Sequence, residues 1–309
     1  MTLISQKDAK NHILKTFLDV ILHYKLIIMT EYSITKEIIR GKLKPRAKES
    51  HKGDYGHALI IAGGKGKIGS AVLATKACLR SGVGLLTTHI PACGEAVLQT
   101  AIPEAMISVD TNDKLFSDNI GNFHFKTIAF GPGLGTAVLT QKAIHHLLKV
   151  EKIPMVIDAD GLNCISLNKE WFNLIPENSI LTPHPGEFER LVGPWETLED
   201  RTRLQIDFAK RINSIVVVKG GPTYIAAPDG SLYVNTTGNP GMAKGGSGDA
   251  LTGMITAFLS QNYASLDAAI LGVYIHGLAG DKAVVKTTEY GLLATDLIEA
   301  IPEAMKELL

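Results

Sequence analysis

The sequence has no excess of charge of either sign and few cysteines. Its 309 residues contain 31 Lys and Arg and 31 Asp and Glu, so no net field draws the protein to a nucleic acid or to an anionic membrane. The cysteines, Cys78, Cys93 and Cys164, are odd in number and far apart, which gives neither a disulfide framework nor zinc-ligand spacing. These absences favour a small-molecule partner and a reducing, cytoplasmic compartment.

A long uninterrupted apolar run is also lacking. The stretch most like a targeting sequence, residues 17–29 (FLDVILHYKLIIM), contains Asp19 and Lys25 and is followed by no small-residue cleavage site. It is too short to span a bilayer. We expect an amphipathic helix that packs on the body or on another subunit; alternatively, Met29 is the true start. The chain is divided into an N-terminal helical extension, residues 1–50, and one domain, residues 51–309.

From residue 56 onward, short β-rich runs alternate with helical patterns. HALIIAG precedes SAVLATKACLRSG, TIAFG precedes TAVLTQKAIHHLLKV, and MVIDAD and SILTPH follow. This alternation predicts an α/β fold, a three-layer sandwich with a mostly parallel central sheet flanked by helices and with ligands at the carboxyl ends of the strands. Asp229 and Gly230 join two later strands in a predicted hairpin. Closing helices are expected at residues 265–285 and 296–308, the second with Thr295 as its N-cap.

Gly64, Gly66 and Gly69 match the pattern G-x-G-x-x-G between an expected strand and an expected helix. A dinucleotide-binding fingerprint also needs an acidic residue about 20 positions on, at the end of the next strand. That strand ends here at His89 and Pro91, so the fingerprint is incomplete. We therefore expect these glycines to line a substrate pocket, where a ligand can approach the backbone closely.

The segment KGGSGD, residues 244–249, opens another expected helix. Successive glycines let backbone amides point inward as an anion-binding nest, which nominates Gly246, Ser247 and Gly248 as an anion hole. A bound phosphate would repel a neighbouring aspartate, whereas a general base can take the proton of a hydroxyl that attacks the phosphoryl group. Asp249 is therefore the candidate catalytic residue. The alternative is an ordinary helix-capping aspartate.

The segment NTTGNPGMAKGGSGDALTGMITAFL resembles the closing motif of the ribokinase-like superfamily, and more narrowly that of the ADP- or ATP-dependent NAD(P)H-hydrate dehydratases. Seven further segments match in the family's order: HKGDYGHALIIAGG, GSAVLATKACLRSGVGLL, IPEAM, GPGLG, VIDADGLN, LTPHPGEFERL and VVVKGGPT. Together they extend from residue 52 to the C-terminus.

The resemblance implies a carbon-oxygen lyase that returns (6S)-NADHX or (6S)-NADPHX, nicotinamide cofactors hydrated at C6 of the reduced ring, to NADH or NADPH. ADP or ATP would phosphorylate the C6 hydroxyl in a Mg²⁺-dependent step, so that the oxygen leaves as phosphate and AMP or ADP remains. Asp249 would be the base on that hydroxyl, and the amides of residues 246–248 would hold the transferred group. Relatives are commonly tetrameric, so we expect a homotetramer.

The matched motifs imply further site residues. The adenine nucleotide would contact Lys219, Gly220, Gly221, Pro222, Thr223 and Gly248, and the hydrated cofactor would contact Ala71, Gly133, Gly135, His184 and Asp249. The metal ligands are not fixed by the sequence, but Asp158 and Glu187 are candidates, directly or through water. Asp158 could instead bind backbone amides under the site, and Lys219 could be a solvated side chain.

The chain departs from the family's pattern at Ser70, where relatives often carry alanine, and this adds a hydroxyl near the substrate pocket. Many bacterial relatives are fused to an epimerase domain, for which 50 preceding residues are too few, so we expect a separate epimerase. Two alternative functions stay open. One is a ribokinase-like kinase of the hydroxyethylthiazole or hydroxymethylpyrimidine type, which would stop at the phosphoester. The other is a non-catalytic nucleotide-binding module, against which Asp249 argues.

Overall fold

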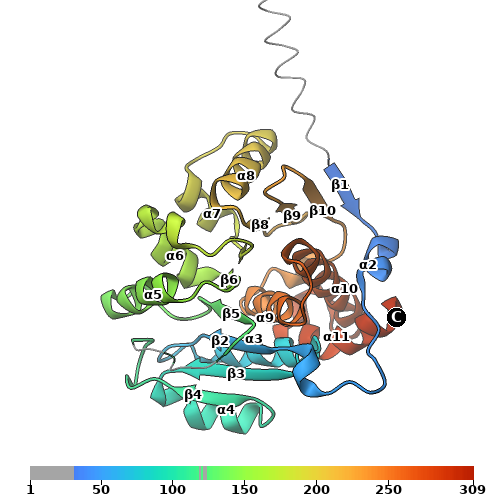
Figure 1. Ribbon diagram of the computed structural model, residues 1–309. Helices are drawn as coiled ribbons and strands as arrows, with labels where there is room; N and C mark the ends of the chain where they lie inside the picture. The colour runs from blue at the N-terminus through green and yellow to red at the C-terminus, as the bar shows by residue number, and fades with distance from the viewer. Residues whose placement is uncertain (1–30, 118–119, 121–123) are drawn as a thin grey trace, which may run out of the picture.

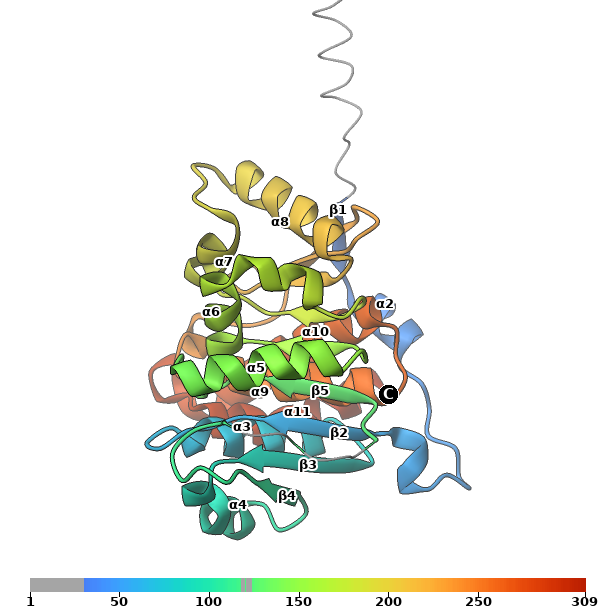
Figure 2. The same cartoon turned by 60° about the vertical axis from the view of Figure 1, so that its left-hand side comes forward.

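The computed structural model describes residues 31–117, 120 and 124–309. In this part of the chain a single sheet is covered by helices on both faces (Figures 1 and 2). The helix expected at residues 17–29 and the alternative start at Met29 lie outside the described residues.

The described residues form ten strands in one sheet, ordered β1-β10-β9-β8-β7-β6-β5-β2-β3-β4. Their bounds are β1 (Glu31–Ile34), β2 (His57–Ile61), β3 (Leu85–Ile90), β4 (Met106–Val109), β5 (Thr127–Phe130), β6 (Met155–Ile157), β7 (Ile180–Leu181), β8 (Ile215–Val218), β9 (Tyr224–Ala226) and β10 (Leu232–Asn235). Neighbours are parallel except for β8 with β9 and β9 with β10. The hairpin predicted over Asp229 and Gly230 is confirmed.

The chain changes direction across the sheet between β2 and β5. From β2 it runs to β3 and β4 on one side, and it then returns to β5 on the other side before β6, β7 and β8. Ligands of open α/β sheets bind outside the carboxyl ends of the strands at such a switch point. The fold therefore points to the loops that follow β2 and β5.

Helices cover both faces of the sheet. The α-helices are α2 (Lys36–Lys42), α3 (Ile68–Arg80), α4 (Glu95–Ala101), α5 (Val138–Val150), α6 (Ala159–Leu167), α7 (Pro185–Val192), α8 (Leu198–Ile212), α9 (Ser247–Ser260), α10 (Ser265–Gly291) and α11 (Ala294–Leu308). Short 3-10 helices are η1 (Lys52–Tyr55), η2 (Ala92–Gly94), η3 (Lys169–Leu174) and η4 (Pro240–Met242).

Two hydrophobic cores lie on the two sides of the sheet. One is shared with α3, α9, α10 and α11, and the other with α5, α6, α7 and α8. In β2, Ala58 and Ile60 belong to the first core and Leu59 and Ile61 to the second, because successive side chains of a strand point to opposite faces. The predicted three-layer α/β sandwich is confirmed.

β1 attaches to the edge of this sheet and α2 packs on α10 and α11, although the sequence placed both in an extension before the domain. β1 pairs in parallel with β10, from Glu31 opposite Leu232 to Ile34 opposite Asn235. Only Ile34 is buried in β1, so this strand lies at the exposed edge of the sheet. The contact with β10 makes this segment part of the folded domain.

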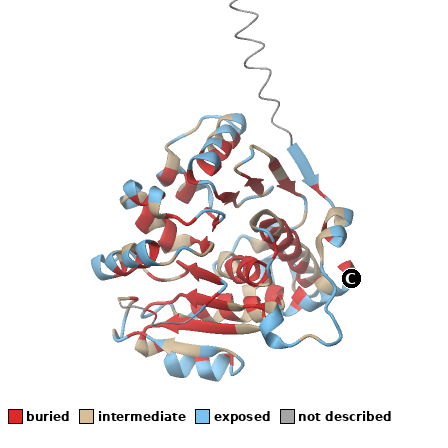
Figure 3. Ribbon diagram, viewed as in Figure 1, coloured by how far each residue is buried: buried red, intermediate tan, exposed pale blue. Residues whose placement is uncertain are grey.

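Helix α10 is long and apolar enough to cross a membrane by length and composition alone. However, 72 % of its most apolar stretch is buried inside the protein, and Figure 3 colours the middle of the helix as buried. A helix that is hydrophobic all round and enclosed by other elements is a core helix. α10 packs against both α9 and α11.

Helix α11 begins one residue before the predicted N-cap. Its first residue is Ala294, so Thr295 lies inside the first turn and the prediction for this residue is wrong. The carboxylate of Asp296 instead accepts a hydrogen bond from the backbone N of Leu293 at 2.9 Å. Because this carboxylate reaches back to the start of the helix, the threonine hydroxyl is not needed there.

We predict that the crossing of α3 and α9 requires glycine at position 253. A Cβ at Gly253 would overlap the carbonyl oxygen of Ala74, so Gly253→Ala should lower the free energy of unfolding by about 1–3 kcal/mol. The matched control is Gly41→Ala in α2, where the new Cβ meets nothing within 4 Å and should stabilise by about 0.5–1 kcal/mol. Urea unfolding followed by circular dichroism measures both, and equal midpoints would contradict this packing argument.

Candidate active site

The predicted motifs meet at the carboxyl edge of the sheet. Asp158 directly follows β6, and Lys219 directly follows β8. The start of α9 reaches the same place, since a Cβ on Gly248 would lie 3.4 Å from Lys219 Nζ and 3.8 Å from Asp158 Oδ2. The structure thus brings together the glycine-rich helix start and the two strand ends that the sequence nominated separately.

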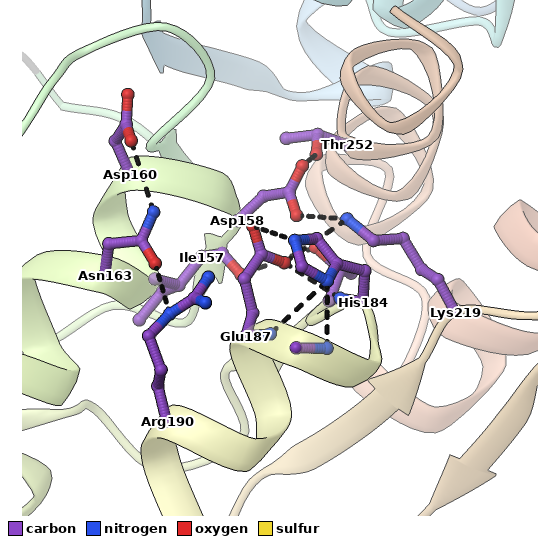
Figure 4. A network of polar contacts seen from close by, with 11 residues as sticks. Ile157, Asp158, Asp160, Asn163, His184, Glu187, Arg190, Lys219 and Thr252 are labelled. Atoms are coloured by element: carbon purple, nitrogen blue, oxygen red, sulfur yellow. Dashed lines mark hydrogen bonds and ion pairs between the residues drawn. The ribbon is translucent and has the colours of Figure 1, made fainter. Parts of the chain in front are cut away.

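An ion pair lies at the centre of this edge (Figure 4). Asp158 Oδ1 is 2.6 Å from Lys219 Nζ, and Asp158 Oδ2 accepts a hydrogen bond from Thr252 Oγ1 at 2.8 Å. The Asp158 side chain is 2 % exposed and that of Lys219 is 20 % exposed. Lys219 is therefore not a solvated lysine, and Asp158 binds side chains rather than the backbone amides that the sequence left as an alternative.

His184 and Glu187 lie on the other side of Lys219. Glu187 Oε2 is 3.9 Å from Lys219 Nζ and accepts the backbone N–H of His184 at 2.8 Å. His184 caps α7, because its Nδ1 accepts hydrogen bonds from the amides of Gly186 and Glu187. In the neutral ring the proton is therefore on Nε2, 3.4 Å from Glu187 Oε1. The His184 side chain is 51 % exposed, which leaves its ring accessible to a ligand.

The glycine loop after β5 borders this centre. A Cβ on Gly131 would overlap the carbonyl oxygen of Asp158, and one on Gly64 would lie 3.0 Å from the carbonyl oxygen of Gly133. Gly133 and Gly135 both have positive φ. The amide of Gly135 donates to Asp160 Oδ2 at 2.7 Å, so the carboxylate of Asp160 anchors the loop.

The side chain of Thr223 closes the loop that follows β8. Thr223 Oγ1 donates to the carbonyl oxygen of Gly220 at 2.9 Å and accepts from the amide of Gly220 at 3.2 Å. Gly220, Gly221 and Thr223 are partly or fully exposed, so the turn presents backbone to solvent beside Lys219.

Ala71, which the sequence placed in the substrate pocket, is fully buried and faces Gly63. Its contact with a substrate stays a prediction.

The start of α9 has the features of an anion site. Gly246 has a left-handed φ of 94°, and a Cβ there would lie 2.6 Å from Leu73 Cδ1, so only glycine fits without strain. The first amides of an α-helix have no partner within the helix, and the helix dipole makes this end positive. At residues 246–248 the backbone can therefore receive a phosphoryl group.

Asp249 occupies the third position of α9. The N-cap is Gly246, so Asp249 lies inside the first turn and not at the N-cap position that the alternative assigned to it. Burial raises the pKa of Asp249, and the carboxylates of Asp158 and Asp160 raise it further against the opposing effects of Ser70 and Lys219. A carboxylate with a raised pKa is a more effective general base near neutral pH.

Asp158 and Glu187 fit a Mg²⁺ ion that is held chiefly by phosphates. Lys219 Nζ lies between the two carboxylates, and among the described residues no group of three or more His, Cys, Asp or Glu could hold an ion by itself. Mg²⁺ commonly keeps several waters and binds through one or two carboxylates together with substrate phosphates. The donor set suits that arrangement and not a cage made of protein ligands alone.

Two polar residues of the site were not found from the sequence. Thr252 follows Asp249 by three positions, and residues at this spacing share one face of a helix, so a signal was present. His276 lies in α10, with Nε2 2.9 Å from the carbonyl oxygen of Ser247 and 3.3 Å from its Oγ. His276 is 29 positions from Ser247 in the sequence, and only the packing of α9 on α10 brings these two residues together. Burial lowers the pKa of His276 to about 4.

We predict that His276 makes the protein less stable in mild acid. The unfolded state binds a proton near pH 6.5 and the folded state only near pH 4, so the unfolded state carries more protons between these values and stability falls as the pH falls. The loss should approach about 3 kcal/mol at pH 4. His276→Gln does not titrate, and urea unfolding between pH 4 and 7 should show a shallower slope for this variant. Parallel slopes would contradict a neutral buried imidazole.

Relatives of known name cover nearly the whole chain. The family model described as NAD(P)H-hydrate dehydratase matches residues 58–303. The ADP-dependent (S)-NAD(P)H-hydrate dehydratase of Bacillus subtilis is 35 % identical over 274 residues, which are 88 % of this chain and 97 % of that protein. The protein of the same name from Listeria monocytogenes is 33 % identical over 276 residues, 88 % of this chain and 96 % of that protein.

Other relatives are longer. The bifunctional NAD(P)H-hydrate repair enzyme of Moorella thermoacetica is 34 % identical over 306 residues, 94 % of this chain and 57 % of that protein. The chain thus spans little more than half the length of this relative.

Solved structures of related proteins resemble this chain in sequence and in fold. The ADP/ATP-dependent NAD(P)H-hydrate dehydratase of Bacillus subtilis, co-crystallised with ATP and Mg²⁺, has a TM-score of 0.78 and 31 % identity, covering 91 % of this chain and 100 % of that chain. Ribokinase of Cryptococcus neoformans, at 14 % identity and a TM-score of 0.52 over 76 % of this chain and 87 % of that chain, shares the fold alone. Together with the geometry at the start of α9, these likenesses show that the chain belongs to the NAD(P)H-hydrate dehydratase family and has a ribokinase-like fold.

Proposed function

We propose that the protein uses ADP or ATP to dehydrate (6S)-NADHX and (6S)-NADPHX to NADH and NADPH. The observation that carries the proposal is the partly buried carboxylate of Asp249 at the start of α9, beside the backbone amides of residues 246–248. A base next to an anion site can deprotonate a hydroxyl while that oxygen attacks a bound phosphoryl group. Relatives named as ADP-dependent dehydratases of the (S)-hydrate support this assignment.

The chemistry proceeds in two stages. In the first, the C6 oxygen of the hydrate bonds to the terminal phosphorus, the bond from that phosphorus to AMP or ADP breaks, and Asp249 takes the hydroxyl proton. In the second, electron density from the ring nitrogen expels phosphate from C6, and loss of a proton from C5 restores the double bond. Hydroxide is a poor leaving group, so the nucleotide is consumed to convert the hydroxyl into phosphate, which is a good leaving group.

The nucleotide would lie between the loop of residues 219–223 and Gly248. Lys219 Nζ stands at the start of α9, where its charge can neutralise a phosphate. A bound Mg²⁺ ion would neutralise further negative charge, with Asp158 and Glu187 as the carboxylates that hold its waters. The B. subtilis structure that was co-crystallised with ATP and Mg²⁺ supports this part of the proposal.

The hydrated cofactor would lie at the switch point between β2 and β5. Gly133 and Gly135 provide partly exposed backbone there, and His184 offers a half-exposed imidazole at the start of the neighbouring α7. Gly64 contacts the same loop, which supports the prediction that the glycines after β2 line a substrate pocket. Ala71 would support this pocket from beneath.

The proposal includes a cytoplasmic location, a homotetramer and a separate epimerase for the opposite hydrate. Cys78, Cys93 and Cys164 are free thiols, and burial raises the pKa of Cys164 to about 12, so this thiol is inert. Such cysteines are compatible with a reducing compartment. Bifunctional repair enzymes among the relatives support a functional link to an epimerase.

The test combines the purified protein with an epimer mixture of NADHX, Mg²⁺ and either ADP or ATP. Absorbance of the reduced nicotinamide is followed together with phosphate release. We expect nucleotide-dependent recovery of about half of the mixture, with one phosphate released for each NADH formed. A stable phosphoester in place of NADH would indicate a kinase, and nucleotide binding without any turnover would indicate a non-catalytic module.

We predict that Asp249→Asn abolishes turnover but not nucleotide binding. The amide keeps the size of the side chain and cannot accept the hydroxyl proton, so kcat should fall about 10²–10⁴-fold. Calorimetry should show ATP affinity within about threefold of the wild type. Equal turnover by the variant and the wild type would remove Asp249 as the base.

A further inference from the structure

Helix α10 supports the loop that leads into the anion site. Thr237 Oγ1 donates to the carbonyl oxygen of Tyr274 at 2.8 Å. The amide of Gly238 and the side chain of Asn239 both donate to the carboxylate of Asp281, at 2.9 and 3.0 Å. These hydrogen bonds fix the segment before residues 246–248 to one side of α10.

Glycines on α10 let this loop approach the helix backbone. A Cβ on Gly277 would overlap the side chain of Thr237, and one on Gly280 would overlap Met242. Packing at this distance leaves little freedom for movement. The loop therefore reaches α9 from a rigid platform.

His276, also on α10, contacts Ser247 at the anion site. His276 is 9 % exposed, and its Nε2 lies 2.9 Å from the Ser247 carbonyl oxygen. A carbonyl oxygen can only accept, so Nε2 carries the proton. The same Nε2 faces Ser247 Oγ at 3.3 Å, and a protonated nitrogen can only donate to that hydroxyl. The hydrogen of the Ser247 hydroxyl must then point to a different acceptor.

We propose that His276 is a positioning residue that orients Ser247, so that the Ser247 hydroxyl donates its hydrogen to the phosphoryl group held by residues 246–248. This inference rests on the proposed function. The imidazole does not contact the substrate; it sets the direction of a donor that does. Because burial keeps His276 neutral, with a pKa of about 4, the single Nε2–H donor is present throughout the neutral pH range.

The kinetic test compares two substitutions of His276. Leucine removes the donor at similar volume, and glutamine returns an N–H near the position of Nε2. We expect His276→Leu to lower kcat about 10–100-fold, since small misplacements in a site have effects of this size, with the KM for nucleotide changed less than about threefold. His276→Gln should restore kcat to within about threefold of the wild type. Equal losses in the two variants, or none in either, would overturn the inference.

A double substitution tests whether His276 acts through Ser247. If it does, Ser247→Ala should lower kcat in the wild type but by less than about twofold in the His276→Leu background, because residues that act as a unit are not additive. Fully additive losses would overturn the coupling. His145→Leu serves as the control: this histidine lies in α5, on the opposite face of the sheet, and stacks on Trp171 of η3, so its loss should leave kcat unchanged.

Binding of inorganic phosphate separates this inference from the proposed function. Phosphorus NMR titration should show weaker phosphate binding by His276→Leu than by the wild type or by His276→Gln. If the wild type fails to repair NADHX but this order of affinities holds, the proposed function is wrong and the inference stands. Identical affinities in the three proteins, or no phosphate binding by the wild type, would overturn the inference.

Discussion

The ion pair between Asp158 and Lys219 joins segments that lie far apart in the sequence. Two charges removed from water are stable only if their remaining hydrogen-bonding capacity is used, and the hydroxyl of Thr252 meets this need at 2.8 Å. The pair therefore ties the ends of β6 and β8 to α9. Without Lys219, the carboxylates of Asp158 and Glu187 would face each other with no cation between them. Together with the packing of α9 on α3 and α10, this contact fixes the first turns of α9 and with them Asp249.

The site divides its tasks between the two faces of the sheet. On one face, α9 and α10 supply the amides of residues 246–248, the proposed base Asp249 and the buried imidazole of His276. On the other face, Asp158 and His184 are the N-cap residues of α6 and α7, in the connections that follow β6 and β7. A nucleotide and a second ligand that meet at the strand ends would thus contact both layers at once. A ribokinase-like fold can therefore serve both kinases and dehydratases. Whether the reaction stops at the phosphoester or continues to dehydration depends on the stability of the phosphorylated product.

The sequence predicted the parts of this arrangement that depend on local patterns. Alternating apolar runs gave the layers, and glycine spacing gave the loop before Asp249 and the loop of Gly133 and Gly135. It did not predict β1, because a four-residue segment gives little signal before its pairing with the distant β10 is known, nor did it predict the partners of Asp158. It could not predict His276, because a lone histidine in an apolar helix carries no signal until α10 is packed on α9. Contacts between distant segments are what the structure adds.

The central claim is that the substrate's own oxygen attacks phosphorus. It is tested most directly with NADHX that carries ¹⁸O in its C6 hydroxyl, by mass spectrometry of the phosphate released during turnover. The account predicts that each phosphate contains one labelled oxygen, because the C6 oxygen leaves bound to phosphorus. Unlabelled phosphate, with the label in water, would mean that the nucleotide is hydrolysed by water and that the hydroxyl leaves by another route. That result would contradict the mechanism assigned to Asp249 and the start of α9.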